Sequence, residues 1–355
     1  MIILAAAIIL SLSNSGIIGK ANKAKTDSDT ANLKEYVNTL RAEWELMTAE
    51  EQTAAGSFVD YANSKLAEKG YKRELAADGE TVMNENATAA VKAGIKVGCE
   101  VEGYNDLLDE KEYPIKAGVI DATDEQTLKT NSKYKWYYIG IGEDGNLLIA
   151  PKISGTLAAE DKMTLKGVKG YLNGEEELNN ACRVLYSVEG KGTARSMNID
   201  DVNSILGYTG EKGQYYDETD NLLTIGQTGQ VKELGTNTRT PEKPTNGTVE
   251  DISKYKLDFY SVSKSRTDII NKELVFASSD TCAYWLSSTC VGAYFNLGYA
   301  FFSMRGVNSI SVNSYSLFYS QNSSRTMSCA VRPVVALNSN MKLTPNADKT
   351  VWAIN

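Results

Sequence analysis

The chain has 355 residues, of which 42% are hydrophobic and 23% are charged, a globular composition long enough for two domains. Its formal net charge is −8, and it has no dense cluster of lysine and arginine. These features argue against a nucleic acid as partner, because neutralising phosphates requires a basic surface. The chain has no histidine, which removes the commonest general base and metal ligand.

The first residues, Met1 to Leu12, are almost entirely apolar. This segment is shorter than the roughly twenty residues of a membrane-spanning helix. It could be the core of a signal peptide, although the positively charged region that precedes such a core is missing. The interpretation we prefer is the second half of a membrane segment that starts upstream of Met1, because of the helix that follows.

After Gly19 the sequence predicts a long polar helix with a narrow apolar stripe, spaced to pack on one partner surface. Thr48 and Glu51 have the spacing of a capping box and predict a second helix that ends at Gly70. The stripe consists of Leu33, Val37, Leu40, Trp44 and Met47, and the second helix is expected to turn Phe58, Tyr61, Ala62 and Leu66 inward.

An apolar stub that leads directly into an amphipathic helix resembles the N-terminal region of type IV pilin-like proteins. The resemblance covers residues 1–47. It implies that the apolar half sits in the membrane before assembly and in a filament core afterwards. The glycine, phenylalanine and glutamate of a prepilin cleavage site are not present. Processing and filament assembly would therefore require a start upstream of Met1.

The middle of the chain changes from helical to strand patterns. Residues 71–92 are predicted to be a linker or a further short helix, because residues 84–86 interrupt the pattern. Alternation then predicts a strand at 94–101 and a hairpin at 136–150. Further on we expect a helix at 172–185 with Leu178, Ala181, Cys182 and Leu185 on one face, a helix at 199–206 capped by Ser196 or Asn198, an exposed loop at 241–247, and strands at 257–262 and from residue 275.

The five cysteines suggest neither a zinc site nor a redox site, because they are irregularly spaced and include no C-x-x-C pair. We expect buried thiols, and a disulfide such as Cys290 with Cys329 stays open. The other cysteines are Cys99, Cys182 and Cys282.

The sequence contains no recognisable catalytic grouping. Without histidine, a serine or cysteine triad cannot form, and no phosphate-binding or dinucleotide-binding glycine loop is present. A nucleophile at Cys282 or Cys290 would need a lysine base or a strongly lowered pKa. The acidic turn at 217–220 lacks the calcium-loop pattern. We therefore predict a protein that is not an enzyme and that uses no cofactor or metal.

Three arginines lie among apolar or small residues: Arg195, Arg305 and Arg332. We predict that each forms a buried bidentate pair with a carboxylate, and a contact with a ligand is the alternative.

Residues 284–337 are rich in serine, asparagine, tyrosine, phenylalanine and glycine, and their apolar residues keep strand spacing, with Ile310 among them. One face of each strand can therefore enter a core, while the other shows rings, hydroxyls and amides to water. A rigid surface of this composition is typical of a paratope. A soluble β domain with an ordinary polar face would give the same pattern.

Six motifs stand out along the chain: 134–150, Gly192–Ser196, Ile199–Val202, Tyr284–Ser288, Met304–Val307 and Ala330–Leu337. Together they resemble a family of uncharacterised bacterial surface domains that are often found behind pilin-like N-termini. The resemblance covers roughly residues 93–345, and its closing third is similar to the C-type-lectin fold of formylglycine-generating-enzyme-like domains and of diversity-generating-retroelement variable proteins. The calcium motifs of sugar-binding lectins and the cysteine pair of the formylglycine-generating enzyme are absent.

The resemblance implies that changeable side chains within residues 290–328 form a ligand surface on a fixed scaffold. The scaffold positions would be Trp285, Ala300, Phe302, Met304, Val307, Val312, Leu317, Val331 and Pro333. The ligand-binding positions would be Tyr294, Asn296, Tyr299, Phe301, Ser303, Asn308, Ser309, Ser311, Asn313, Tyr315 and Tyr319.

Together these observations predict an α+β protein. A pilin-like anchor at 1–70 and a linker at 71–92 would precede a β-rich, C-type-lectin-like domain with two or more short helices at 93–355. The expected function is ligand binding, as an adhesin or receptor at the bacterial cell surface, with an unknown protein or glycan as ligand. Residues 1–47 would associate with a membrane or pilus and could support self-assembly. The alternative function is a structural pilin-like or pseudopilin subunit whose head is a spacer.

Overall fold

The computed structural model describes residues 17–153, 161–209, 215–231, 235–240, 257–258, 261–294, 299–320 and 324–355. The fold is α+β: N-terminal helices precede mixed β-sheets with a few short helices, at 29% helix and 32% strand. The chain divides into two compact units, one formed by Met1–Ala89 with Ile141–Asn146 and the other by Ala90–Gly140 with Leu147–Asn355. The apolar segment at 1–12 lies outside the described residues.

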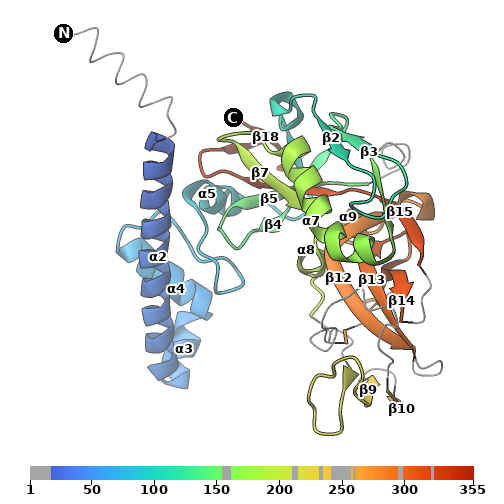
Figure 1. Cartoon of the computed structure of the whole chain (residues 1–355). Helices are drawn as coiled ribbons and strands as arrows, with labels where there is room; N and C mark the ends of the chain where they lie inside the picture. The colour runs from blue at the N-terminus through green and yellow to red at the C-terminus, as the bar shows by residue number, and fades with distance from the viewer. Residues whose placement is uncertain are drawn as a thin grey trace. The chain divides into compact units, whose positions relative to one another are not determined.

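The first unit is built on helix α2, Ile17–Leu46, and helix α4, Phe58–Glu68 (Figure 1). The predicted apolar stripe on α2 does pack against another surface, and that surface belongs to the same chain. Leu33, Val37 and Leu40 are at most 4% exposed. They form one cluster with Tyr61, Ala62 and Leu66 of α4, and Trp44, Met47 and Phe58 pack at its margin.

The second predicted helix is in fact two helices. Helix α3, Ala49–Ala55, begins with the expected capping box, in which the Glu51 carboxylate accepts a hydrogen bond from the Thr48 backbone N at 2.8 Å. It ends at Gly56, whose φ of 88° is unfavourable for other residues. A second capping box, from Ser57 to Asp60, then starts α4.

Residues 71–92, expected to be a linker or a short helix, contain a β-bridge and a helix. Leu75 and Val82 form the bridge, and both are buried in the cluster of α2 and α4. Helix α5, Glu85–Ala93, starts after Asn84, whose Oδ1 accepts a hydrogen bond from Ala87 N at 2.8 Å. Asn84 therefore begins this helix rather than interrupting a pattern.

In the described part of the second unit, a seven-stranded sheet has the order β17-β18-β1-β4-β5-β16-β7. The predicted hairpin at 136–150 is confirmed as β4 and β5. The strand predicted at 94–101 is wrong except at its end, because Gly94 and Gly98 both have a φ of 97°. The strands are β17 Leu343–Pro345, β18 Val351–Ile354, β1 Glu100–Glu102, β4 Trp136–Ile141, β5 Leu147–Pro151, β16 Pro333–Leu337 and β7 Gly192–Ser196.

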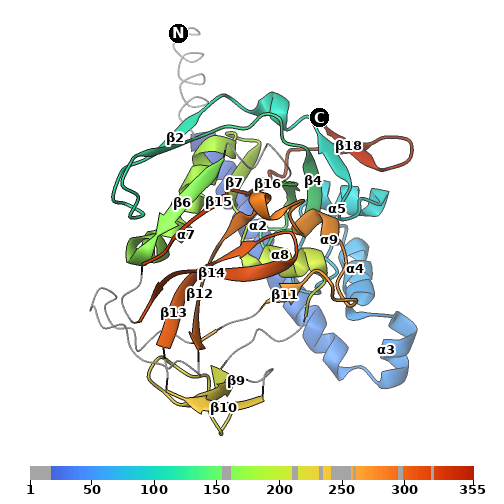
Figure 2. The same ribbon diagram turned by 90° about the vertical axis from the view of Figure 1, so that its right-hand side faces the viewer.

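A six-stranded sheet with the order β11-β14-β13-β12-β15-β6 forms in the same described part (Figure 2). Its neighbouring strands are antiparallel, apart from the parallel pair β12 and β15. The strands are β11 Val262–Ser263, β14 Ser311–Tyr319, β13 Tyr299–Val307, β12 Tyr284–Tyr294, β15 Thr326–Ala330 and β6 Lys162–Lys166.

Helix α7, Gly167–Tyr186, packs on the strands of this sheet. It approaches β6 closely, since a Cβ on Gly174 would lie 2.9 Å from Cδ1 of Leu165. The apolar face predicted on this helix is confirmed as buried: Leu178, Ala181, Cys182 and Leu185. Helix α8, Ile199–Leu206, is capped by Asn198 rather than by Ser196.

The remaining elements are short. The two-stranded sheet is β2 Glu112–Ile115 with β3 Gln126–Lys129, and β8 Tyr215–Tyr216, β9 Gly229–Val231 and β10 Gly235–Arg239 form another small sheet. Helix α9 spans Lys272–Val275, and single turns occur at Asn105–Leu107 and Asp280–Cys282. The loop predicted at 241–247 lies outside the described residues. Within the described residues, no helix is both long and apolar enough to cross a membrane.

Candidate functional site

The scaffold predicted for the closing domain is confirmed as core. The Trp285 indole also donates a hydrogen bond to the Met163 carbonyl at 2.8 Å, which ties β12 to β6. All nine predicted scaffold positions are buried: Trp285, Ala300, Phe302, Met304, Val307, Val312, Leu317, Val331 and Pro333.

The strand register assigns the predicted ligand-binding residues to two opposite faces of the sheet. Paired residues on antiparallel strands point to the same face. Asn313 and Tyr315 of β14 pair with Gly306 and Met304 of β13, and Trp285 of the other neighbouring strand, β12, also pairs with Gly306. These residues therefore share one face of the sheet. Phe301 pairs with Tyr319 and Ser303 with Ser316, on the face opposite Met304.

Three predicted positions are buried. Phe301 is 4% exposed, Ser303 0% and Tyr319 9%. The Phe301 ring lies over Gly292, where a Cβ would come within 2.1 Å of it. The Ser303 hydroxyl donates to Ser316 Oγ at 3.3 Å. The expectation that these three side chains are displayed is therefore wrong.

The physical reason is that β13 is covered on both faces. Helix α7 packs on one face. On the other, Asp258 forms a β-bridge with Val291 of β12, and Asp258 Oδ2 accepts a hydrogen bond from Arg305 at 3.1 Å. Arg305 is only 1% exposed, so its predicted carboxylate partner is confirmed, with this contact made through a single nitrogen, Nη2.

Five predicted positions remain partly exposed and contiguous, and we call them the recognition strip: Asn308, Ser309, Ser311, Asn313 and Tyr315. Ser311, Asn313 and Tyr315 alternate along β14, so they share one face, about 6.8 Å apart from one to the next. The turn before them carries Ile310, whose side chain is 63% exposed. The expectation that Ile310 enters the core is wrong, because the residue lies in the turn between β13 and β14.

Both ends of the recognition strip are held in place. Asn308 Oδ1 accepts hydrogen bonds from Ile310 N at 3.0 Å and from Ser311 N at 2.8 Å. The Tyr315 ring packs edge-on against Trp285, with centroids 5.6 Å apart, and covers Gly306. The strip is therefore ordered before any ligand arrives, which lowers the entropic cost of binding.

A polar, basic segment borders the recognition strip. Strand β11 pairs with the first residues of β14, and Lys264 N then donates to the Ile310 carbonyl at 2.8 Å. The side chains of Lys264, Ser265 and Arg266 are exposed. Arg266 donates two hydrogen bonds to Asp268, at 2.9 and 2.6 Å.

Tyr299 lies at the far end of the hairpin from the strip. Tyr299 is half-buried and packs edge-on against Tyr319, with ring centroids 5.3 Å apart. The Tyr294 side chain and Asn296 lie outside the part of the chain that the structure describes. The structure thus brings together five of the eleven predicted residues.

The other two arginines differ from each other in their partners. Arg195 forms the predicted bidentate pair, with Asp201, at 2.6 and 2.7 Å. The pair is not buried as predicted, because the Arg195 side chain is 41% exposed. Arg332 does not follow the prediction. Its guanidinium is 1% exposed and donates to three uncharged oxygens: the Pro151 carbonyl at 2.8 Å, the Tyr284 hydroxyl at 2.7 Å and the Leu274 carbonyl at 2.6 Å.

The five cysteines are free thiols. Cys182, Cys282, Cys290 and Cys329 are at most 2% exposed, as predicted, while Cys99 is half-buried. Burial raises the pKa of the Cys290 thiol to about 11 and that of Cys329 to about 12. Cys290 and Cys329 therefore stay protonated at neutral pH.

The acidic turn at 217–220 is organised around Asp217. Its carboxylate accepts hydrogen bonds from Asn221 N at 2.9 Å and Thr219 N at 2.8 Å, which lower its pKa to about 2. The carboxylate thus stabilises a turn. Across the described ranges, no group of three or more acidic or cysteine side chains is arranged to hold a metal ion.

Comparison with known proteins found no matching family model, no matching curated protein and no matching solved structure. The resemblance to lectin-like surface domains therefore stays a prediction from the sequence.

Proposed function

We propose that this chain is a ligand-binding protein of the bacterial cell surface, without enzymatic activity, and that the recognition strip contacts the ligand. The C-type-lectin-like architecture and the anchor in residues 1–47 are parts of the same proposal. The ligand is a protein or a glycan. The proposal is supported above all by the partly exposed, pre-ordered row of asparagine, serine and tyrosine on β14.

The physical chemistry of the strip suits recognition. Tyrosine offers a large contact area at a low entropic cost, and serine and asparagine offer adaptable hydrogen bonds. The residues stand on a strand rather than on a loop, which fixes their positions more closely. Ile310 adds an exposed apolar side chain beside them, and the bordering residues 263–266 enlarge the polar area.

The alternative of a filament subunit depended on the apolar stripe of α2 as a surface for other subunits. In this structure α4 of the same chain covers Leu33, Val37 and Leu40. The stripe therefore does not favour that alternative.

An array of glycans and of secreted proteins tests the proposal with the immobilised full chain. We expect a ligand whose binding is weakened about tenfold by Asn313→Ala, since one lost polar contact of about 1.4 kcal/mol has that effect. Asn340→Ala serves as the matched control, because Asn340 is an exposed asparagine outside the strip. Equal binding by both variants to every ligand found would refute the role of the strip.

Deep sequencing of the codons for residues 290–328 in a bacterial population tests whether the surface is diversified. Substitutions concentrated at the recognition strip, with Phe301 and Ser303 unchanged, would indicate a receptor whose ligand differs between cells. An invariant segment would indicate a fixed binder.

A further inference from the structure

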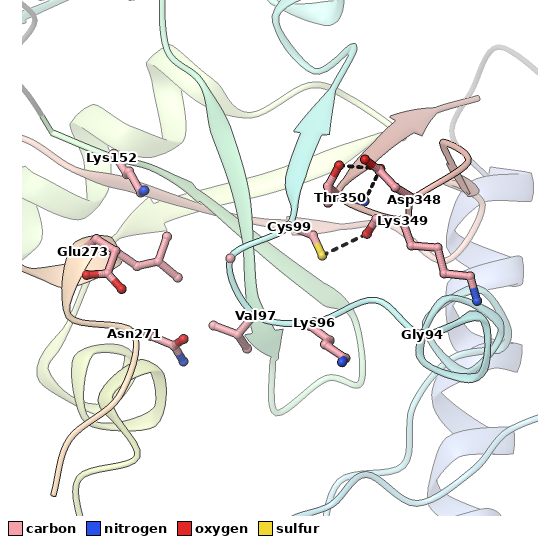
Figure 3. Close-up of a pocket in the computed structure, with 12 residues that line it drawn as sticks. Gly94, Lys96, Val97, Cys99, Lys152, Asn271, Glu273, Asp348, Lys349 and Thr350 are labelled. Atoms are coloured by element: carbon pink, nitrogen blue, oxygen red, sulfur yellow. Dashed lines mark hydrogen bonds between the residues drawn. The ribbon is translucent and has the colours of Figure 1, made fainter.

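A pocket of about 570 Å³ lies in the second unit, where four segments distant in sequence meet (Figure 3). Its volume falls in the range of small-molecule sites, roughly 300–1,000 Å³. The lining comes from residues 94–99, from Lys152 at the end of β5, from residues 271–274 around α9, and from residues 348–350 before β18. No single segment of the sequence carries the chemistry of this pocket, so the sequence alone does not predict it.

The buried Arg332 ties two walls of this pocket together. Its Nε donates to the carbonyl of Pro151, the residue before Lys152. Its Nη2 donates to the carbonyl of Leu274, in the lining segment at 271–274. Because one rigid guanidinium bridges both carbonyls, the spacing between Lys152 and the segment at 271–274 is set without a ligand.

The pocket carries an excess of positive charge, although the whole chain has a net charge of −8. Three lysines line it, Lys96, Lys152 and Lys349, against two carboxylates. One of these, Asp348, accepts hydrogen bonds from Thr350 Oγ1 at 2.6 Å and from Thr350 N at 3.1 Å. Its carboxylate is therefore occupied by its own loop.

The charge of Arg332 adds to this field from behind the wall. The guanidinium donates these three hydrogen bonds to uncharged oxygens and not to a carboxylate. The three contacts therefore do not neutralise its charge. A buried cation in that setting favours an anion nearby, because the attraction is weakly screened in the interior. The positive charges of the lining and of Arg332 therefore both favour a negatively charged ligand.

We propose that this pocket binds a small hydroxylated carboxylate of monosaccharide size, that is, a sugar acid. The ammonium group of Lys152 binds the ligand carboxylate. Lys349, which Figure 3 shows on the far side of Cys99 from Lys152, adds positive charge at the other end of the pocket. Asn271 and Glu273 accept hydrogen bonds from its hydroxyl groups. This site is separate from the recognition strip and does not depend on the function proposed for the strip.

Two features of the lining fit the hydroxyl groups of such a ligand. Asn271 donates through Nδ2 to the Ile205 carbonyl at 3.0 Å, which orients its amide, and an amide oxygen accepts hydrogen bonds. Val97 and Leu274 are the apolar side chains among the twelve lining residues. The three lysines, the two carboxylates, Asn271 and Thr350 give the hydroxyl groups of a ligand several hydrogen-bonding partners.

Lys152 is itself held in position. Its Nζ lies 4.7 Å from the centroid of the Tyr137 ring, a cation–π contact. The ammonium of Lys349 lies beside Gly94, where a Cβ would be 3.7 Å from it.

Cys99 provides a reporter for this pocket in the unmodified chain. It lines the pocket and is half-buried, with Sγ 3.4 Å from the Lys349 carbonyl oxygen. The four other cysteines are at most 2% exposed. Iodoacetamide should therefore alkylate Cys99 first, and a ligand in the pocket should shield it.

The experiment measures the rate of Cys99 alkylation in the full chain by mass spectrometry, with increasing D-glucuronate, D-glucose or inorganic phosphate. We expect saturable protection by glucuronate, about tenfold at saturation, and none by glucose. Protection by phosphate as strong as that by glucuronate would overturn the sugar-acid assignment, because the pocket would then be a simple oxyanion site. No protection by glucuronate would overturn the proposal altogether.

Charge-removing variants give an independent test. Lys152→Gln should weaken the apparent affinity for glucuronate about tenfold. Lys349→Gln should weaken it less, because its ammonium lies at the other end of the pocket from Lys152. Lys342→Gln is the matched control, since Lys342 is exposed and does not line the pocket. The exposed Lys96→Gln adds a variant with little risk to folding. An equal loss of affinity in Lys342→Gln, or unchanged affinity in all three pocket variants, would contradict the proposal.

Discussion

The two faces of the β13–β14 hairpin each place an aromatic ring over a glycine, yet they differ in their access to solvent. On one face Phe301 covers Gly292 and is 4% exposed. On the other Tyr315 covers Gly306 and remains half-buried. The same local chemistry therefore gives a core contact on one face and a surface residue on the other. What decides the outcome is how far the packing on each face extends. Helix α7 covers Phe302 and Phe318 on the Tyr315 face but leaves Tyr315 partly exposed.

The largest expected difference between the faces is in stability. Phe301→Ala should lower the free energy of unfolding by about 3–5 kcal/mol, because it empties a filled site in the core. Tyr315→Ala should lower it by only about 1–2 kcal/mol, since that ring is half-buried and its main loss is the contact with Trp285. Urea unfolding measures both values. Equal losses would show that the faces do not differ as described.

The ion pair beneath the covered face should have the next largest effect. Asp258→Asn removes the charge that accepts from Arg305 and should cost about 2 kcal/mol, because the arginine stays buried. The same change should leave ligand binding intact, since Asp258 lies on the face opposite the recognition strip. If Asp258→Asn kept full stability but lost ligand binding, Asp258 would belong to the binding face and not to the opposite one.

Changes at exposed isoleucines, one of them in the turn between β13 and β14, should have little effect on stability. Ile310→Asp and Ile270→Asp alter isoleucines that are 63% and 60% exposed, so each should change the free energy of unfolding by no more than about 0.5 kcal/mol. Thermal unfolding of the two variants against the wild type checks this. A loss of several degrees in Ile310→Asp alone would place that side chain in the core.

The smallest expected effect is a difference in thiol reactivity between the two faces. Cys290 pairs with Ser303 on the covered face, and burial raises its pKa to about 11. At pH 8 only about one such thiol in a thousand is ionised, so it should resist alkylation. A thiol introduced by Ser311→Cys, on the strip, should react readily. Labelling of Cys290 in the native protein at a rate similar to that of the introduced cysteine would contradict the claim that its face of the sheet is covered.

The helical part of the fold could be predicted well because its signals are local. The stripe of α2 and the capping box at Thr48 need only a few neighbouring residues to be recognised. The missed boundary at Gly56 was also local: Ser57 and Asp60 repeat the same capping pattern. The pattern at 84–86 predicts an interruption, whereas the Asn84 side chain caps α5.

The candidate site could be predicted only in part, because its exposure is set by contacts between distant residues. Alternation along β13 correctly separated Phe302 and Met304 from Phe301 and Ser303. It could not show that the second face is also covered, since Asp258 lies more than forty positions before Arg305 in the sequence. The bridge made by Arg332 between Pro151 and Leu274 is equally invisible in the sequence, as is the pocket that it braces.

The most direct test of the recognition strip compares ligand binding by the full-length wild type, Ile310→Asp and Ile270→Asp on the same array of glycans and secreted proteins. The two variants add the same charge at equally exposed isoleucines, so they differ in position alone. We predict that a ligand of the wild type is retained by Ile270→Asp and lost by Ile310→Asp. Retention of every ligand by both variants would contradict the claim that this strip is the binding surface.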